Sequence, residues 1–267
     1  MSEQEPTVLQ QDEAGGVRRI SLNRPEKRNA FNAEVIASLT EALRNASEDP
    51  AVRVVILAAT GKHFSAGADL EWMRSTAAMS ESENRDDARH LANLMRTLDE
   101  LDKPVIARIQ GAAFGGALGL ICCADIAVAA ENARFCLSEV RLGLAPATIG
   151  PYVVRALGHR RARRYMLTAE VFDAIQARTM SLVHEVVPQD ELDDEVARMT
   201  EALLQGGSQA QSACKKLLST LDNPAAIPNI DEHTATMIAE LRTGAEGQEG
   251  LRAFLEKDEP YWRGGHS

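Results

Sequence analysis

The sequence predicts an α/β fold built around a mostly parallel sheet, and two observations predict it. Before residue 190, apolar runs typical of strands alternate with segments of helical periodicity, which is the pattern of crossover units. From Glu191 onward the chain is almost wholly helical. We therefore expect an α/β core in residues 1–205 and a helical subdomain in residues 206–267.

The predicted elements follow one another in a regular order. Residues 6–23 alternate in polarity around a glycine turn and predict a hairpin whose second strand is Val17–Leu22. Asn32 stands where the N-cap of a helix belongs, and Asp49-Pro50 ends that helix. Further strands are predicted at 52–58, 104–109, 125–130 and 183–187, with a short one near 135. Helices are predicted at 70–79, 82–101, 160–167 and 174–180, and others begin after Gly116 and near Thr148. From 191 on the chain is predicted to be helical, with breaks at 206–207 and 223–229.

Composition is that of an ordinary globular protein and narrows the possible partners. Of 267 residues, 45% are hydrophobic and only 4% aromatic, so we expect a core of small and aliphatic side chains. The formal charge of −10 argues against nucleic acid as the main partner, because binding phosphates needs an excess of Lys and Arg. The arginine-rich segment at 155–164 is interpreted as a solvated helix face. No apolar run approaches the length that crosses a bilayer.

Cysteine and histidine usage predicts a reducing compartment and no metal site. The four cysteines lack ligand spacing, and the six histidines form no paired motif. We therefore expect free thiols, a cytoplasmic location and no bound metal. The first residues are acidic and polar, so we expect no signal peptide.

Two glycine-rich turns form the candidate site. One is Gly61-Lys-His-Phe-Ser-Ala-Gly-Ala-Asp69, and the other is Gly111-Ala-Ala-Phe-Gly-Gly116; each follows a predicted strand and precedes a helix. Glycine there lets another molecule approach the backbone, and the first amides of a helix have no intrahelical partner. Two such turns facing one carbonyl would make an oxyanion hole, although either turn alone is also explained by close packing.

Together with further motifs, these turns resemble the enoyl-CoA hydratase/isomerase superfamily, whose crotonase fold is a spiral of ββα units with a C-terminal helical oligomerisation subdomain. The resemblance implies an acyl-CoA thioester substrate, no cofactor beyond the coenzyme A of that substrate, no nucleic acid or membrane partner, and a homotrimer or homohexamer. The matching segments cover nearly the whole chain: Leu22–Phe31, Phe64–Leu70, Lys103–Ala107, Gln110–Gly116, Cys123–Ala127, Phe135–Glu139, Leu142–Pro146 and Phe254–Tyr261.

The resemblance also implies roles for individual residues. The thioester oxygen is expected between the backbone amides of Ala68 and Gly116. Phe254 and Lys257 are expected to reach the coenzyme A of a neighbouring subunit. Contacts to coenzyme A within the same subunit are expected from Lys27, Arg28, Ala30, Ala66, Asp69 and Leu70.

Glu139 matches one of the two glutamates that typical hydratases of this family use. In an apolar strand and loop, desolvation raises the pKa of a carboxyl toward the range in which it can take and return a proton. We expect Glu139 to be the acid/base. The alternative is a surface carboxylate paired with Arg141.

Glu139 corresponds to the second of these glutamates along the chain; the first glutamate position matches Gly119, and glycine cannot do acid–base work. A simple transfer of the two-glutamate mechanism is therefore ruled out, and three interpretations stay open. Glu139 delivers both the hydroxyl and the proton through one water, or Gly119 opens space for a bulkier substrate or its carboxylate. In the third, the protein is a one-glutamate isomerase that moves an enoyl-CoA double bond.

The segments Gly116–Asp125, Ser138–Tyr152 and Arg160–Thr168 resemble most a bacterial branch of the family. Its members hydrate 3-methylglutaconyl-CoA in leucine catabolism or isohexenylglutaconyl-CoA in acyclic terpene catabolism. Such a substrate carries a distal carboxylate that needs a polar partner if buried. Candidate partners are Arg74, Arg141 and Arg155, and the alternative for each is a surface arginine. Tyr152 either donates a hydrogen bond in the pocket or anchors a helix.

We therefore predict a hydratase of a 3-substituted glutaconyl-CoA. The alternative from a different class is a non-catalytic protein that binds acyl-CoA or RNA, and the acidic net charge disfavours RNA.

Overall fold

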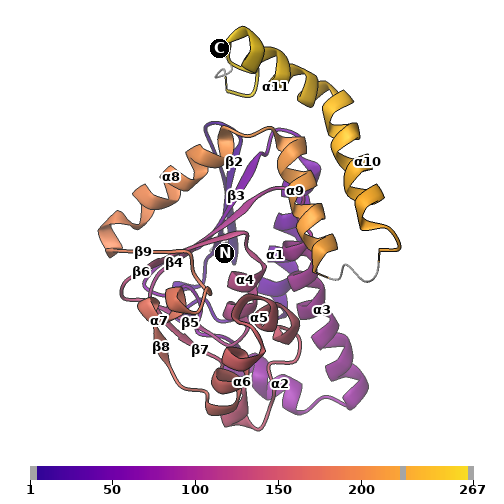
Figure 1. Cartoon of the computed structure of the whole chain (residues 1–267). Coiled ribbons are helices and arrows are strands. Elements are labelled where there is room, and N and C mark those ends of the chain that lie inside the picture. Colours follow the sequence, from indigo (N-terminus) through magenta and orange to yellow (C-terminus); the bar gives the residue numbers. More distant parts are fainter. Residues whose placement is uncertain (1–4, 223–226, 264–267) are drawn as a thin grey trace.

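The computed structural model describes residues 5–222 and 227–263 and confirms the predicted α/β arrangement (Figure 1). The larger sheet has the strand order β1-β2-β3-β4-β6-β9, in which β1 is antiparallel to β2 and the other neighbours are parallel. Its strands are β1 (Val8–Glu13), β2 (Val17–Leu22), β3 (Val54–Ala59), β4 (Val105–Ile109), β6 (Ile126–Ala130) and β9 (Glu185–Val187). A smaller sheet of order β5-β7-β8 contains β5 (Ala112–Phe114), β7 (Arg134–Cys136) and β8 (Phe172–Asp173).

Strand β3 shows why the sequence forms a covered sheet. All six of its residues are apolar and buried, as in a parallel strand covered on both faces. Val55 and Leu57 belong to the large core that the sheet shares with the central helices. Val54 and Ile56 belong to a second, smaller core under α8 (Leu192–Leu204).

Helix α1 (Ala33–Glu48) begins directly after the N-cap that the sequence predicts, and α3 (Glu81–Asp99) begins one residue before its predicted start. Asn32 caps α1, because its Oδ1 accepts a hydrogen bond of 2.9 Å from the amide of Val35. Helix α3 begins with a capping box at Ser80 and packs against α1. The other helices before α8 are α2 (Leu70–Ala77), α4 (Gly116–Cys123), α5 (Gly150–Leu157), α6 (His159–Thr168) and α7 (Ala174–Thr179), with 3-10 helices η1 (Pro25–Lys27), η2 (Glu139–Leu142) and η3 (Gln189–Glu191).

After α8 the chain forms α9 (Ser208–Leu221), whose Lys215 pairs with Asp125 of the core at 2.6 Å, and then α10 (Ile230–Thr243) and α11 (Ala245–Glu256), which extend away from the core (Figure 1). Among their described residues, α9 and α10 bury none. Arg53 ties this region to the core by donating hydrogen bonds of 2.9 Å to the carbonyls of Leu204 and Gly206 and of 3.0 Å to that of Trp262. The division into domains 1–205 and 206–267 stays a prediction.

The structure differs from the sequence prediction in short elements. The stretch between Gly111 and Gly116 contains strand β5 rather than only a turn, and β8 has no counterpart among the predicted strands. Glu139 begins a 3-10 helix instead of lying in an extended loop. The predicted break at 223–229 lies partly outside the described residues, which omit 223–226. Within the described part, no helix is both long and apolar enough to traverse a bilayer.

Candidate active site

The first glycine turn holds Ala68 with its own amide turned outward. Ala68 forms a parallel bridge with Phe31, in which the Phe31 amide donates to the Gly67 carbonyl at 2.7 Å and the Asp69 amide donates to the Phe31 carbonyl at 2.8 Å. The bridge therefore uses the groups on either side of Ala68 and leaves the Ala68 N–H on the opposite side. Within the described residues, this N–H has no hydrogen-bond acceptor.

The second glycine turn starts helix α4. Gly115 has φ +55°, a conformation that favours glycine, and its amide donates to the Cys136 carbonyl at 2.9 Å. Gly116 is the first residue of the helix, so its amide lacks an intrahelical partner. A Cβ at Gly116 would lie 3.1 Å from Cε2 of Phe31, so the ring of Phe31 packs directly on this backbone.

The two turns lie against each other. Ser65 bridges to Ala113 through hydrogen bonds of 3.0 Å in each direction, from the Ser65 amide and from the Phe114 amide. A Cβ at Gly115 would lie 3.8 Å from the Cα of Gly67, and one at Gly67 would lie 3.2 Å from the Phe114 carbonyl oxygen, so the two turns are in close contact. Both glycines have a positive φ, a conformation that favours glycine. Phe31 and Ser65, to which the sequence motifs assign no role, hold the turns together. The arrangement can present two amides to one oxygen, and the roles of Ala68 and Gly116 stay predictions.

Glu139 lies beside the second turn. Its Oε1 lies 3.4 Å from the position of a Cβ at Gly115, and its Oε2 is buried with no hydrogen-bond partner among the described residues. Burial raises the pKa of the Glu139 carboxyl above its ordinary value. The alternative of a surface pair with Arg141 is wrong, because the Arg141 guanidinium donates to the Ala169 carbonyl at 2.6 Å.

The structure corrects the interpretation of Gly119 as open space. Gly119 is buried, and a Cβ there would lie 2.9 Å from the Cβ of Ile149 and 2.8 Å from the Sδ of Met95. Ile149 is 1% exposed and Met95 is fully buried. These side chains fill the volume that a glutamate would need, so Gly119 gives no room to a substrate.

The predicted coenzyme A contacts fall on the rim of the first turn. The Ala66 amide donates to the Arg28 carbonyl at 2.9 Å, which places the loop with Lys27, Arg28 and Ala30 beside the turn. Leu70 is 70% exposed. Asp69 differs, because its side chain is occupied within the protein.

Asp69 is the N-cap of α2. Its Oδ1 accepts a hydrogen bond of 2.8 Å from the Glu71 amide, and its Oδ2 accepts one of 3.0 Å from Arg24. Burial alone would raise the pKa of the Asp69 carboxyl, but the amide of Glu71, Arg24 and the amide of Trp72 hold it below its ordinary value. The Asp69 side chain therefore anchors the turn. Arg24, which the sequence motifs also leave without a role, is the second residue after β2 and lies in the segment Leu22–Phe31.

One chain does not bring Phe254 and Lys257 to the glycine turns. Both lie at the end of α11, far from α4 in Figure 1, and Phe254 is 82% exposed. Their expected contact with a neighbouring subunit's coenzyme A stays a prediction.

Most candidate partners for a distal carboxylate are engaged elsewhere. Arg155 forms ion pairs with Asp99 and, at 3.4 Å, with Asp222, and its guanidinium lies 5.6 Å from the centroid of the Tyr152 ring. Arg141 is held by the carbonyl of Ala169. Arg74 is exposed on α2 and has no ion pair within the described part of the chain.

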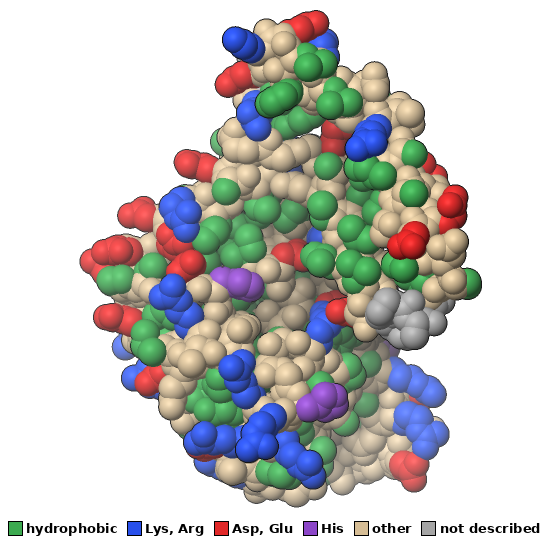
Figure 2. All heavy atoms as spheres, viewed as in Figure 1, with side chains coloured by type: hydrophobic (Ala, Val, Ile, Leu, Met, Phe, Trp, Pro, Cys, Tyr) green, Lys and Arg blue, Asp and Glu red, His purple; other side chains and the backbone are tan. Residues whose placement is uncertain are grey.

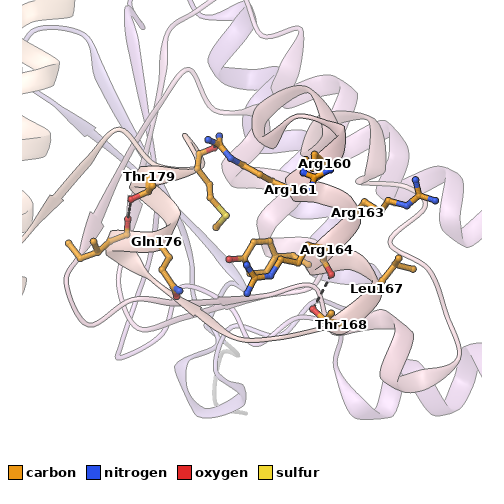
Figure 3. A pocket seen from close by; sticks show the side chains of 11 residues that line it. Arg160, Arg161, Arg163, Arg164, Leu167, Thr168, Gln176 and Thr179 are labelled. Carbon is orange, nitrogen blue, oxygen red and sulfur yellow. Dashed lines mark hydrogen bonds between the residues drawn. The ribbon is translucent and has the colours of Figure 1, made fainter.

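A pocket of about 770 Å³ lies apart from these turns, between α6 and α7 (Figure 3). Four arginines line it, but Arg164 binds Glu170 at 2.6 Å and Arg161 donates to the Met180 carbonyl at 3.2 Å. Neither glycine turn nor Glu139 lines this pocket. Among the described residues, no group of three or more His, Cys, Asp or Glu side chains has a metal-binding arrangement.

The comparisons with known proteins cover nearly the whole chain. The family model described as enoyl-CoA hydratase/isomerase matches residues 12–265. A crotonyl-CoA hydratase of Syntrophomonas wolfei is 32% identical over 95% of this chain and 96% of its own, and a mevalonyl-coenzyme A hydratase of Aspergillus fumigatus is 34% identical over 91% and 90%. The crystal structure of an enoyl-CoA hydratase from Shewanella pealeana is 48% identical, with a TM-score of 0.93 over 96% of each chain.

Proposed function

The chain belongs to the enoyl-CoA hydratase/isomerase family and is an enoyl-CoA hydratase, and we propose that its substrate is a 3-substituted glutaconyl-CoA, such as 3-methylglutaconyl-CoA or isohexenylglutaconyl-CoA. One observation carries the proposed chemistry: the carboxyl of Glu139, whose Oε2 is buried without a partner among the described residues, lies beside the second glycine turn, and that turn packs against the first. The acyl class is supported by the resemblance of residues 116–125, 138–152 and 160–168 to the bacterial branch.

In the proposed reaction, the amides of Ala68 and Gly116 donate hydrogen bonds to the thioester oxygen. As water adds to the β-carbon, negative charge develops on this oxygen, and the two donors stabilise it. The Glu139 carboxylate takes a proton from the attacking water and returns it to the α-carbon, so the carboxylate is regenerated and one water is added. No electrons are gained or lost overall, so the proposed reaction needs no redox cofactor.

Turnover of crotonyl-CoA, 3-methylglutaconyl-CoA and isohexenylglutaconyl-CoA, measured side by side, tests the substrate. We expect kcat/KM to be highest for one of the two carboxylated thioesters. A clear preference for crotonyl-CoA would contradict the glutaconyl assignment and leave the hydratase assignment intact.

The variant Glu139→Gln tests the mechanism. It keeps the shape of the side chain and removes its basicity, so we expect kcat to fall roughly 10²–10⁴-fold. Binding of the acyl-CoA, measured by calorimetry, should stay within a few-fold of the wild type because the amide donors are unchanged. A variant with wild-type turnover would remove Glu139 from the reaction.

The single carboxylate at the site also favours a second candidate, movement of an enoyl-CoA double bond by one glutamate. Because Ile149 fills the volume at Gly119, this place holds no second acid. Incubation in ¹⁸O water separates the two reactions: hydration places the label on the β-carbon, and isomerisation does not. Acyl-CoA binding without any turnover would instead indicate a non-catalytic binding protein.

We further infer a homotrimer or homohexamer in the cytoplasm. The exposed apolar residues of α10 and α11 support the oligomer, and hydrophobic side chains gather on this part of the surface in Figure 2. Four free cysteines support a reducing compartment. Burial raises the pKa of the Cys122 thiol to about 12, which keeps that thiol protonated and unreactive.

A further inference from the structure

Helix α4 carries a notch at Gly119, and the side chain of Ile149 sits in it. The notch exists because Gly119 has no Cβ, and Met95 of α3 closes its other side. Ile149 is the residue directly before α5, and it is 1% exposed. The side chain of Ile149 therefore packs on α4 next to the contact that α5 itself makes with α4.

Ile149 also ends the loop that carries Glu139. From Ser138 to Thr148, only Pro146 is buried, and Leu142 and Leu144 are 57% and 59% exposed. Besides the buried Pro146, two further contacts hold the loop. Near its start, the guanidinium of Arg141 donates to the Ala169 carbonyl at 2.6 Å, and at its end Ile149 is seated on α4.

The seat of Ile149 and the predicted oxyanion donor belong to the same helix face. Gly116 and Gly119 are three residues apart on α4, and residues at this spacing are neighbours on a helix surface. A shift of Ile149 in its notch would therefore move the end of the Glu139 loop relative to the amide of Gly116. Reaction rates respond strongly to such shifts, because a misplacement of about 1 Å can cost roughly 10²-fold.

We propose that Ile149, seated over Gly119, is a positioning residue that fixes the Glu139 loop against the helix carrying the Gly116 amide. The proposal rests on the proposed function of Glu139 and Gly116. The proposal also explains the glycine at 119, because any side chain at this position would displace Ile149 from its contact with α4.

Four variants test the proposal by steady-state kinetics and thermal unfolding of the full chain. Ile149→Ala empties the notch, Ile149→Val is the conservative replacement, and Gly119→Ala displaces Ile149. Val153→Ala is the matched control, since Val153 lies one turn further on α5 and is fully buried. We expect Ile149→Ala and Gly119→Ala to lower kcat about tenfold or more with KM within threefold. Ile149→Val should retain most of the activity.

The control separates positioning from stability. Val153→Ala is expected to lower the melting temperature about as much as Ile149→Ala while kcat stays within threefold of the wild type. The double variant Gly119→Ala/Ile149→Ala should recover kcat above either single variant, because the new methyl group refills the emptied notch.

The proposal is overturned if Ile149→Ala keeps wild-type kcat, or if Val153→Ala loses as much kcat as Ile149→Ala. Either result leaves the proposed function standing when the wild type turns over its thioester and Glu139→Gln does not. The proposed function fails separately if Glu139→Gln is as active as the wild type.

Discussion

The carboxyl of Glu139 combines two demands that oppose each other. As a base it must be ionised, yet its Oε2 is buried without a partner among the described residues, and burial raises its pKa. A carboxylate in such a place is a stronger base than one in water and destabilises the folded protein. Residues at catalytic sites often have this conflict between activity and stability.

The first prediction concerns the pH dependence of Glu139→Gln stability. Near pH 4 the carboxyl is protonated in the folded chain and mostly protonated in the unfolded chain, so the variant and the wild type should differ little in stability. As the pH rises through the raised folded-state pKa, the wild type alone acquires a buried charge. We expect Glu139→Gln to be more stable at pH 7 by on the order of 1 kcal/mol, reduced by partial exposure to water.

Urea unfolding at pH 4 and pH 7 measures this difference. Glu81→Gln is the control, because Glu81 is an exposed carboxylate that pairs with Arg85. This variant should show no gain in stability over the wild type at pH 7. The opposite result would be a Glu139→Gln variant whose stability relative to the wild type is lower at pH 7 than at pH 4. It would show that the carboxylate has favourable partners in the folded state.

Two glycines of α4 show what the sequence reveals at the residue scale. Gly116 and Glu139 stand in contiguous motifs, so the sequence alone is enough to single out both. The reason for Gly119 is not visible there, because it depends on Ile149, a residue of a later loop that packs on α4. The missing glutamate is therefore evident from the sequence, whereas one of the three interpretations of its loss, an open space, is wrong.

At the scale of elements, the first glycine turn is held by the start of α2. Asp69 caps this helix and pairs with Arg24, and the two side chains are only 5% and 14% exposed. Ala68 directly precedes this anchor, so the direction of its amide depends on the cap. The predicted oxyanion hole is therefore coupled to the stability of a helix start.

Replacing Asp69 tests this coupling. Asp69→Ala removes the cap and leaves the Arg24 guanidinium part-buried without its partner, so we expect a stability loss of about 2–4 kcal/mol together with a lower kcat. Asp69→Asn keeps an oxygen at the cap and should lose less of both. Glu71→Ala, an exposed change in the same helical turn, is the control and should stay near the wild type. Chemical denaturation and steady-state kinetics of the three variants measure both effects. A fall in the stability of Asp69→Ala without a fall in its kcat would contradict the coupling.

Long elements are predictable from the sequence and short ones are not. The apolar run of β3 and the capped, periodic helices α1 and α3 carry their signals within their own segments. Strand β5 has three residues between glycines, and its partner β7 comes from a later part of the chain. Its existence depends on tertiary pairing, which no local pattern contains.

At the scale of the whole molecule, the C-terminal helices lack a core of their own. Among the described residues, α11 buries only Glu246 and Ala253, while Phe254 and Leu255 are 82% and 76% exposed. Short helices are marginal in water without tertiary packing. The proposed homo-oligomer would supply that packing by covering this apolar surface with a second copy of the chain.

Polar replacements on α11 are therefore expected to dissociate the oligomer. The double variant Phe254→Ser/Leu255→Ser removes two exposed apolar side chains from the helix end, so sedimentation should shift toward the monomer at micromolar concentration. Leu9→Ser, a similar change on the edge strand β1, should leave the wild-type assembly intact. If Phe254 also reaches a neighbour's coenzyme A, KM should rise in the variant even at concentrations that restore the oligomer. A double variant with wild-type sedimentation would show that this end of α11 lies outside the interface.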